Sequence, residues 1–322
     1  MSLDLQKLAD DCKIAQNCSS ETISLLTALE NKYPQEELVE IYNHFLSMET
    51  DPTVLQNIIR CIDKIRDPSS MDVLFDLLLM KDKFQSISNS PEDYVNVRVM
   101  ATKCLANFKD TKAVLPLLYC LNNKDENYKI RLSCAEALGK IGDKYAVAPL
   151  LEVVSDESEK SVYIKESAVM ALGMIGDMRA VDTLVSILET KKGFMDKFTF
   201  LKERALEALG KFNFHNERVM KALKNSLMDE SAQVRISAIE ALMNTEDDRA
   251  VLLIKQMLKD QDEEVVKNAV IALYNLVGSD ILTEILESDD ASVICKREAQ
   301  SLYDEYEFEE IGEEIGEEIY DE

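Results

Sequence analysis

Tryptophan is absent from this 322-residue sequence, and glycine, proline and histidine are scarce, with 9, 6 and 2 residues. So few turn-forming residues exclude a fold of many short strands, because each strand would need a turn of its own. The histidines, His44 and His215, have no evident group of cysteine or carboxylate ligands around them in the sequence. Both are therefore interpreted as ordinary surface or core residues, and no metal or other cofactor is expected.

The seven cysteines are scattered, odd in number and contain no C-x-x-C pair. This pattern argues against both a disulfide framework and a zinc site. The first residues, MSLDLQKLADD, are acidic where a secretory signal would be basic and then apolar, and no apolar run of about 18 residues occurs. We therefore expect a cytoplasmic protein that neither spans nor is targeted to a membrane.

Charge is strongly biased toward one sign, with 61 acidic and 36 basic residues and a formal net charge of −25. Proteins that bind duplexes or anionic membranes usually neutralise phosphates with clustered lysine and arginine. The balance therefore argues against nucleic-acid and membrane partners and favours protein partners, basic ones among them.

Catalytic motifs are also missing. The sequence has no P-loop, no G-x-S-x-G and no dinucleotide-binding glycine motif. No catalytic residue is nominated, and binding is expected to be the activity.

What the sequence does contain is a repeat. Residues 134–154 read CAEALGKIGDKYAVAPLLEVV, and residues 168–188 read AVMALGMIGDMRAVDTLVSIL, in the same register without a gap. A leucine recurs about every 31 to 37 residues, and it follows a cysteine in the first copy and an alanine in the others, at Leu105, Leu138, Leu172, Leu209, Leu242 and Leu273. Such a period is typical of a helical repeat array.

Each period divides into two amphipathic helical stretches. Gly142 and Gly176 follow the last apolar residue of one helix, and Asp143 and Asp177 suit the N-cap of the next. The sequence thus predicts an all-α, right-handed superhelix of about eight or nine helical hairpins. We expect N-terminal capping helices over 1–50, the repeat array over 51–303 and an acidic tail over 304–322. Small residues at the core of the second helices include Cys61, Cys104 and Cys134, which we expect to be buried.

The motif A-x-A-L-G-x-I-G-D-x-x-A-V-x-x-L resembles HEAT repeats of the phycobilisome-lyase type, a subclass of armadillo-like α-solenoids. The resemblance covers residues 50–305 and implies the fold. It leaves the function open, because such repeats serve bilin lyase subunits, degradation adaptors and assembly scaffolds.

Some HEAT-like families are enzymes, and this sequence lacks the residues that their chemistry requires. HEAT-like hydroxylases bind two irons through repeated His-Glu pairs, whereas here Phe45 and Asn216 follow the histidines. HEAT-like DNA glycosylases would need a basic surface with aromatic residues. We favour a non-catalytic protein-binding scaffold or adaptor, with a bilin lyase-type subunit or chaperone acting on a chromoprotein as the alternative.

A basic residue opens each of five successive second helices, at Arg98, Arg131, Lys165, Lys202 and Arg235. A cation at this end opposes the helix dipole and needs compensation. One interpretation is a structural ladder with the acidic residues of the turns, Asp125, Asp156, Asp196 and Asp229 among them. The other is a basic stripe that receives an acidic ligand.

The second helix of each hairpin is expected to line the concave side. Positions opposite its core face follow from 100° per residue, and they predict a partner-binding surface of Ser133, Glu136, Lys140, Met170, Met174, Arg204, Glu207, Lys211, Ser237, Glu240, Asn244, Asn268, Ile271 and Asn275. Most are polar, as a solvated face requires. Met170, Met174 and Ile271 suit adaptable contacts with a partner, or else pack beneath neighbouring side chains.

Three segments depart from the regular array: the turn insertions 81–93 and 191–200, and the tail, which has eleven acidic residues and no basic one. The insertions are either tolerated surface loops or contact sites. The tail repeats Phe308, Ile311, Ile315 and Ile319 at helical spacing. It is interpreted as a solvated tail, a capping helix or a docking segment.

Overall fold

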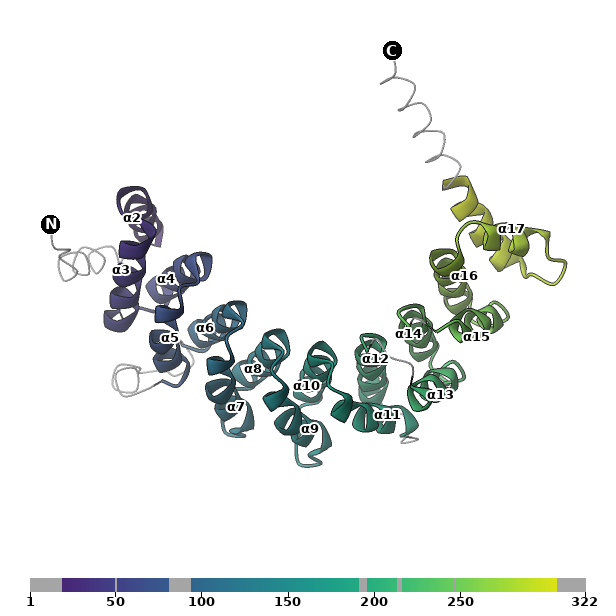
Figure 1. Cartoon of the computed structure of the whole chain (residues 1–322), viewed down its shortest axis with the longest axis horizontal. Helices are drawn as coiled ribbons and strands as arrows, with labels where there is room; N and C mark the ends of the chain where they lie inside the picture. Colours follow the sequence, from purple (N-terminus) through teal and green to yellow (C-terminus); the bar gives the residue numbers. More distant parts are fainter. Residues whose placement is uncertain are drawn as a thin grey trace, which may run out of the picture. The chain divides into compact units, whose positions relative to one another are not determined.

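The computed structural model of the protein describes residues 19–49, 51–80, 94–190, 196–212, 216–245 and 247–305. These residues form successive α-helices with short connections and include no strand, which confirms the all-α solenoid (Figure 1). The insertion 81–93, much of the segment 191–200 and the tail from residue 306 fall outside the described side chains. The chain divides into two compact units, Met1–Ile175 and Gly176–Glu322.

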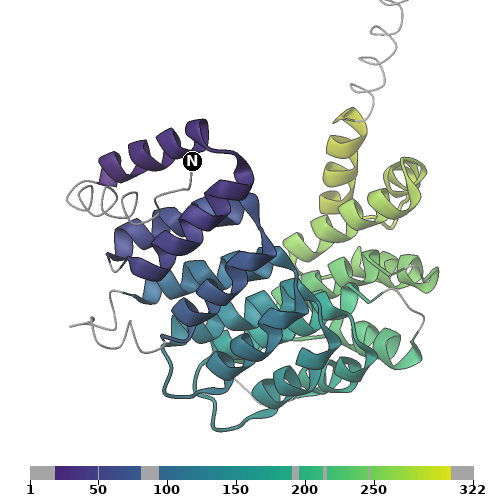
Figure 2. The same ribbon diagram turned by 60° about the vertical axis from the view of Figure 1, so that its left-hand side comes forward.

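The amino-terminal unit consists of helical hairpins. Its helices are α2 (Ser19–Lys32), α3 (Gln35–Met48), α4 (Pro52–Ile65), α5 (Met71–Leu78), α6 (Val95–Phe108), α7 (Val114–Asn122), α8 (Tyr128–Ile141), α9 (Val147–Ser155) and α10 (Val162–Ile175). Figure 2 shows the first of these, in purple and blue, stacked side by side. Short 3-10 turns precede α5, α7 and α9.

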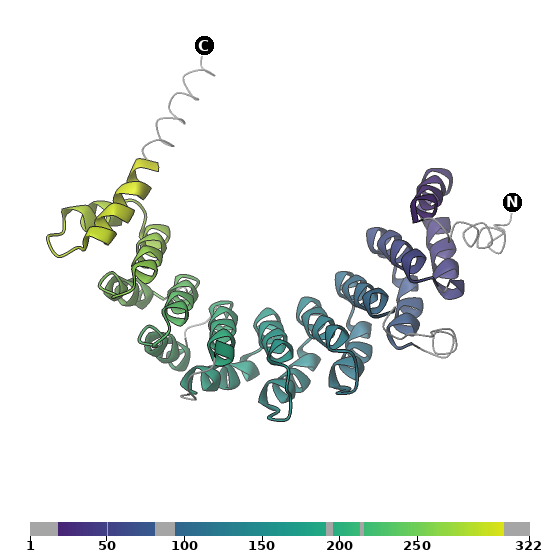
Figure 3. The ribbon, with the colours of Figure 1, turned by 180° about the vertical axis from the view of Figure 1, so that it is seen from behind.

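The carboxy-terminal unit repeats the same plan. Its helices are α11 (Val181–Glu189), α12 (Asp196–Gly210), α13 (Glu217–Ser226), α14 (Ala232–Met243), α15 (Arg249–Met257), α16 (Glu263–Val277), α17 (Asp280–Glu287) and a last helix over 293–305. Within this unit α14 packs between α12 and α16, and α15 and α17 cover α16 (Figure 3).

The glycine predicted to end one helix and the aspartate predicted to cap the next have these roles in the structure. Gly142 ends α8 in the left-handed conformation with φ 79°, where a residue without a Cβ is unstrained. Asp143 then accepts a hydrogen bond of 2.8 Å from the Tyr145 N–H, which satisfies a free donor at the start of the next helical turn. Lys109 occupies the place of Gly142 in the preceding repeat and also has a positive φ, 54°. The turn geometry is therefore shared even where glycine is not.

The core of the amino-terminal unit lies between two layers, one of first helices and one of second helices. In the second layer α6 packs between α4 and α8, and α8 packs against α10. Leu105 and Leu138, two of the repeat leucines, are fully buried. The cysteines expected to replace core alanines, Cys61, Cys104 and Cys134, are buried too.

Two pairs of second helices, α8 with α10 and α12 with α14, pack closely at a glycine. A Cβ placed on Gly139 of α8 would lie 2.7 Å from the Ala171 Cα of α10, so only glycine allows this approach. The same close approach occurs in the carboxy-terminal unit between Gly210 and Ala241, at 3.0 Å. Small residues in the second helices therefore fix the distance between adjacent repeats.

Candidate binding groove

A groove of about 460 Å³ crosses the layer of second helices in the amino-terminal unit. Its polar lining comes from α4, α6 and α8, and consists of Arg60, Asp63, Lys103, Asn107, Ser133, Glu136 and Lys140. Its apolar lining consists of Ile59, Met100, Cys104, Ala106 and Ala137. Three residues predicted for the binding surface, Ser133, Glu136 and Lys140, are thus brought together in one groove.

The neighbouring helix α6 supplies five groove residues, and three of them are equivalent to the predicted residues of α8 although the prediction had not included them. Met100, Lys103 and Asn107 stand five before, two before and two after Leu105. Ser133, Glu136 and Lys140 have the same offsets from Leu138. The repeat register itself is therefore the signal that identifies the residues of α6.

A chain of hydrogen bonds links the three helices across the groove. The Lys140 Nζ donates to the Asn107 Oδ1, and the Asn107 Nδ2 donates to the Asp63 Oδ1 at 2.7 Å. The Arg66 Nε lies 3.5 Å from the same Asp63 oxygen. These contacts fix the side chains of Lys140, Asn107 and Asp63 along the groove.

Three polar groups in the groove make no hydrogen bond or ion pair with the described part of the chain. Lys103 and Glu136 line the groove and are exposed. Ser133 is only 2% exposed, and its buried Oγ has no hydrogen-bond partner among the described residues. A buried hydroxyl without a partner is costly, and a ligand could satisfy it.

The surface prediction needs a correction at its serine positions. A solvated side chain is expected at Ser133 and at Ser237 of α14, but both are buried. Adjacent second helices pack closely, so a short side chain five residues before the repeat leucine is covered by its surroundings. Glu136 and Glu240, three residues further along, are exposed as expected.

The Cys104 thiol, which lines the groove, is unreactive as a nucleophile. Cys104 is buried, and its burial, with the nearby Asp63 carboxylate, raises the pKa of the thiol to about 12. The thiolate is the reactive form of cysteine. Cys104 therefore contributes a small apolar wall and not a nucleophile.

The two methionines of α10 differ in exposure. Met174 is 50% exposed, whereas Met170 is partly buried. The Met174 Sδ would lie 3.3 Å from a Cβ on Gly139, so this side chain rests over the close contact of α8 and α10. Met174 thus extends the exposed surface of the second helices beyond Lys140.

Three predicted residues of the carboxy-terminal unit, Arg204, Glu207 and Lys211, pair with one another. On α12 the Glu207 carboxylate lies 2.6 Å from Arg204 and 3.1 Å from Lys211. Burial would raise the pKa of Glu207, but hydrogen bonds from Lys211 and Arg204 outweigh it and lower the pKa. Asn244, which directly follows α14, is exposed.

On α16 the three predicted residues make few contacts. The Asn268 side chain donates to the Glu264 carbonyl at 2.8 Å, and the Asn275 Nδ2 lies 3.8 Å from the Met243 Sδ. Ile271 between them is 37% exposed. This apolar side chain therefore faces solvent.

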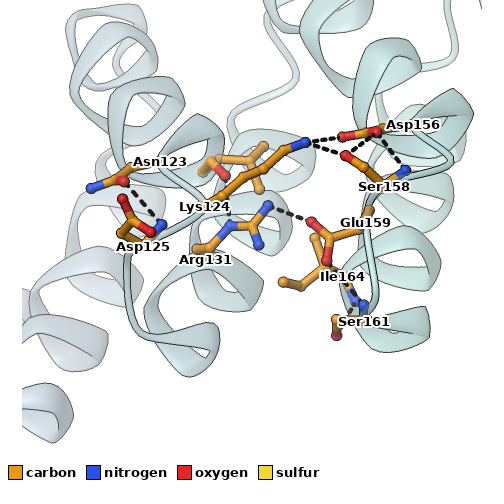
Figure 4. A network of polar contacts seen from close by, with 10 residues as sticks. Asn123, Lys124, Asp125, Arg131, Asp156, Ser158, Glu159, Ser161 and Ile164 are labelled. Atoms are coloured by element: carbon orange, nitrogen blue, oxygen red, sulfur yellow. Dashed lines mark hydrogen bonds and ion pairs between the residues drawn. The ribbon is translucent and has the colours of Figure 1, made fainter.

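Four of the five basic residues predicted to open second helices bind carboxylates, and the three arginines among them also donate to main-chain carbonyls. The Arg131 Nη2 lies 2.6 Å from the Glu159 Oε2, and its Nε donates to the Leu121 carbonyl at 2.8 Å (Figure 4). Lys124, in the same turn as Asp125, pairs with Asp156 at 2.5 Å (Figure 4). The Asp156 pKa is lowered by hydrogen bonds from Lys124 and Ser158.

Equivalent pairs occur in other repeats, and they join Arg98 to Glu126 at 2.6 Å, Lys202 to Asp229 at 2.6 Å and Arg235 to Asp260 at 2.8 Å. In each pair the carboxylate belongs to the turn that follows in the chain, and not to the turn that directly precedes the basic residue. For Lys165, much of the following turn lies outside the described residues. Because these cations already bind carboxylates, the geometry favours the structural ladder over a stripe that receives an acidic ligand.

Comparison with known proteins agrees with this architecture. The family model for HEAT repeats matches residues 84–162, 123–198, 196–275 and 220–302. The chain belongs to the HEAT-repeat family. No protein of curated function matches the sequence.

Two solved structures are similar to this HEAT-repeat chain, each with 18% sequence identity. The structure of human deoxyhypusine hydroxylase in complex with glycerol has a TM-score of 0.35 and covers 87% of this chain and 99% of its own. The complex of CpcE and CpcF of phycocyanin lyase from a Nostoc species has a TM-score of 0.44, and the match covers 83% of this chain and 93% of that one.

Over the ranges that the structure describes, no helix is both long and apolar enough to cross a membrane. Within those same ranges, no three His, Cys, Asp or Glu side chains gather as metal ligands would.

Proposed function

We propose that the protein is a non-catalytic scaffold or adaptor that binds other proteins, and that the groove of α4, α6 and α8 is a contact surface. The observation that carries this proposal is the groove itself, because it places Lys103, Glu136 and the unsatisfied Ser133 hydroxyl in one recess. Packed helices hold the backbones of these residues in place before a partner arrives, which lowers part of the entropic cost of binding.

Charge indicates what kind of partner is favoured. The net charge of −25 attracts basic protein surfaces over long distances. The charge of the groove differs from the acidic charge of the whole chain. Its lining contains three basic residues, Arg60, Lys103 and Lys140, and two acidic ones, Asp63 and Glu136. We infer that general attraction favours basic partners and that the groove selects among them by local charge.

Affinity capture with matched charge-reversal variants tests the groove as the contact surface. Lys103→Glu reverses a charge in the groove, and Lys129→Glu reverses an exposed charge on the first turn of α8, outside it. Both variants and the natural chain are used to capture proteins from the native cell, and bound proteins are quantified by mass spectrometry. We expect partners to be lost with Lys103→Glu and retained with Lys129→Glu.

Equal capture by the two variants would remove the groove from the proposal. The non-catalytic part has its own test, in which the purified protein is incubated with a free bilin and a phycobiliprotein subunit. Covalent bilin transfer, read by zinc-enhanced fluorescence, would show a lyase activity instead. The proposal also places the protein in the cytoplasm, which cell fractionation checks directly.

A further inference from the structure

Equivalent positions on successive second helices form a row across the groove. Arg60 of α4, Lys103 of α6 and Glu136 of α8 each stand two residues before the repeat position that Ile62, Leu105 and Leu138 occupy. All three line the groove. On α10 the same position is Met170, which is partly exposed. Along the helices the row therefore reads cation, cation, anion, thioether.

The centre of this row is available for a ligand. Within the described part of the chain, the Arg60 guanidinium donates a hydrogen bond of 3.0 Å to the neutral Asn57 Oδ1 and forms no ion pair. Lys103 and Glu136 are exposed and unpaired within the described part of the chain. The buried Ser133 Oγ lines the same groove and also lacks a partner there. These groups can serve a ligand without first breaking an ion pair of the protein.

The spacing of the row suits an extended peptide. Packed helices lie about 8–10 Å apart, and an extended chain advances about 3.3 Å per residue. A peptide lying across the helices therefore advances about three residues from one second helix to the next. Its side chains would meet the cations, Glu136 and the methionine at successive intervals of about three residues.

We infer that the groove recognises an extended peptide segment with an acidic residue, a basic residue and an apolar residue at successive three-residue intervals. The acidic side chain pairs with Arg60 and Lys103, the basic one with Glu136, and the apolar one contacts Met170. A main-chain amide or carbonyl of the peptide satisfies the Ser133 hydroxyl. This inference rests on the proposed function and specifies the partner of the same groove.

Mixed charge is the reason for choosing a peptide over a polyanion. A nucleic acid presents phosphates at every step, and Glu136 in the middle of the row would repel one of them. A basic peptide of uniform charge would be repelled by Arg60 and Lys103 in the same way. A ligand that presents an acidic group to the two cations and a basic group to Glu136 complements the charged part of the row.

The test uses the full-length protein and short fluorescent peptides in an anisotropy titration. The first probe is GDGSRGSLG, which has aspartate, arginine and leucine three residues apart, and it is also used in reverse order. The second, GDGSDGSLG, replaces the arginine with aspartate, and the third, GRGSRGSLG, replaces the aspartate with arginine. A single-stranded RNA is included as the polyanion probe.

The natural chain is expected to bind the first probe, in one of its two orders, at least about tenfold more tightly than the others. Glu136→Lys should shift the preference to the second probe and Lys103→Glu to the third. Both residues are exposed, so unchanged thermal melting will confirm folding. Ser133→Ala should weaken the first probe several-fold with no loss of melting temperature, which a purely structural serine would not do.

Failure of the inference can be distinguished from failure of the proposed function. If Lys103→Glu abolishes partner capture but no probe shows a preference for charge order, the groove binds proteins by another pattern and this inference is wrong. If the RNA binds as tightly as the first probe, the peptide assignment is wrong. If partner capture is unaffected by Lys103→Glu, the groove is not the contact surface, and this inference fails together with that part of the proposed function.

Discussion

The Arg131 Nη2 lies 2.6 Å from the Glu159 Oε2, and the two side chains are only 7% and 6% exposed. The pair joins the second helix of one repeat to the turn of the next, 28 residues further along the chain. Arg98 and Glu126 repeat this relationship at the same separation of 28 residues. Such pairs fix how adjacent repeats dock and therefore how the groove-lining helices are placed.

Removal of one member of the buried pair should destabilise the amino-terminal unit. Glu159→Ala leaves the Arg131 charge buried without its carboxylate, and breaking a buried pair in this way costs about 3 kcal/mol. Urea unfolding followed by circular dichroism measures the loss. Glu157→Ala, in the same turn but exposed, is the control and should change stability by less than about 0.5 kcal/mol.

Stability should also fall in acid through this pair. Burial would raise the pKa of Glu159, but hydrogen bonds from the Ser161 N–H and Arg131 outweigh it, so the pKa is lowered in the folded chain. A carboxylate of this kind stabilises the fold above its unfolded pKa of about 4.3 and loses that contribution as pH falls through the folded value.

The matched variant for this pH dependence replaces Arg131 with Met and Glu159 with Leu together. Unfolding free energies measured from pH 7 down to pH 3 should decline less steeply for the double variant than for the natural chain. Identical slopes would mean that Glu159 does not titrate differently in the folded and unfolded chains.

Gly139→Ala should weaken the docking of α8 on α10. The new Cβ would lie 2.7 Å from the Ala171 Cα, a backbone atom that can move only with its helix. Overpacking of this kind costs about 1–3 kcal/mol, against a gain of at most about 1 kcal/mol in helix propensity. A lower melting temperature is expected, whereas Lys129→Ala on the exposed side of α8 should leave it unchanged.

Met174→Lys should separate binding from folding. Because Met174 is half exposed, a lysine can reach solvent there and the free energy of unfolding should change by less than about 0.5 kcal/mol. If the surface of the second helices binds partners, capture should fall. A collapse of the melting temperature would instead make Met174 a core residue, and unchanged capture would exclude it from the binding surface.

Much of the fold was predictable because local signals coincide with the repeat. Leu138, Gly142 and Asp143 mark a core position, a helix end and a helix start within six consecutive residues, and the structure has all three. The face opposite the core also follows from helix geometry, which is why Glu136 and Lys140 were identified as surface residues.

Contacts between repeats were less predictable. The Arg131 partner is Glu159, 28 residues away, rather than Asp125 in its own turn, because the docking of one hairpin on the next decides which carboxylate comes within reach. Burial of Ser133 has the same origin, since neighbouring helices cover a short side chain that helix geometry alone would expose. Helical periodicity describes one element and carries no information on this packing.

Site-specific photo-cross-linking shows whether the second-helix groove is the protein-binding surface. A benzophenone amino acid replaces either Met100, in the groove, or Leu115, which is 64% exposed on the first helix α7. Each variant is irradiated with a purified partner obtained by affinity capture. We expect a cross-link from position 100 and none from position 115. A partner that binds both variants but cross-links only from position 115 would contradict it.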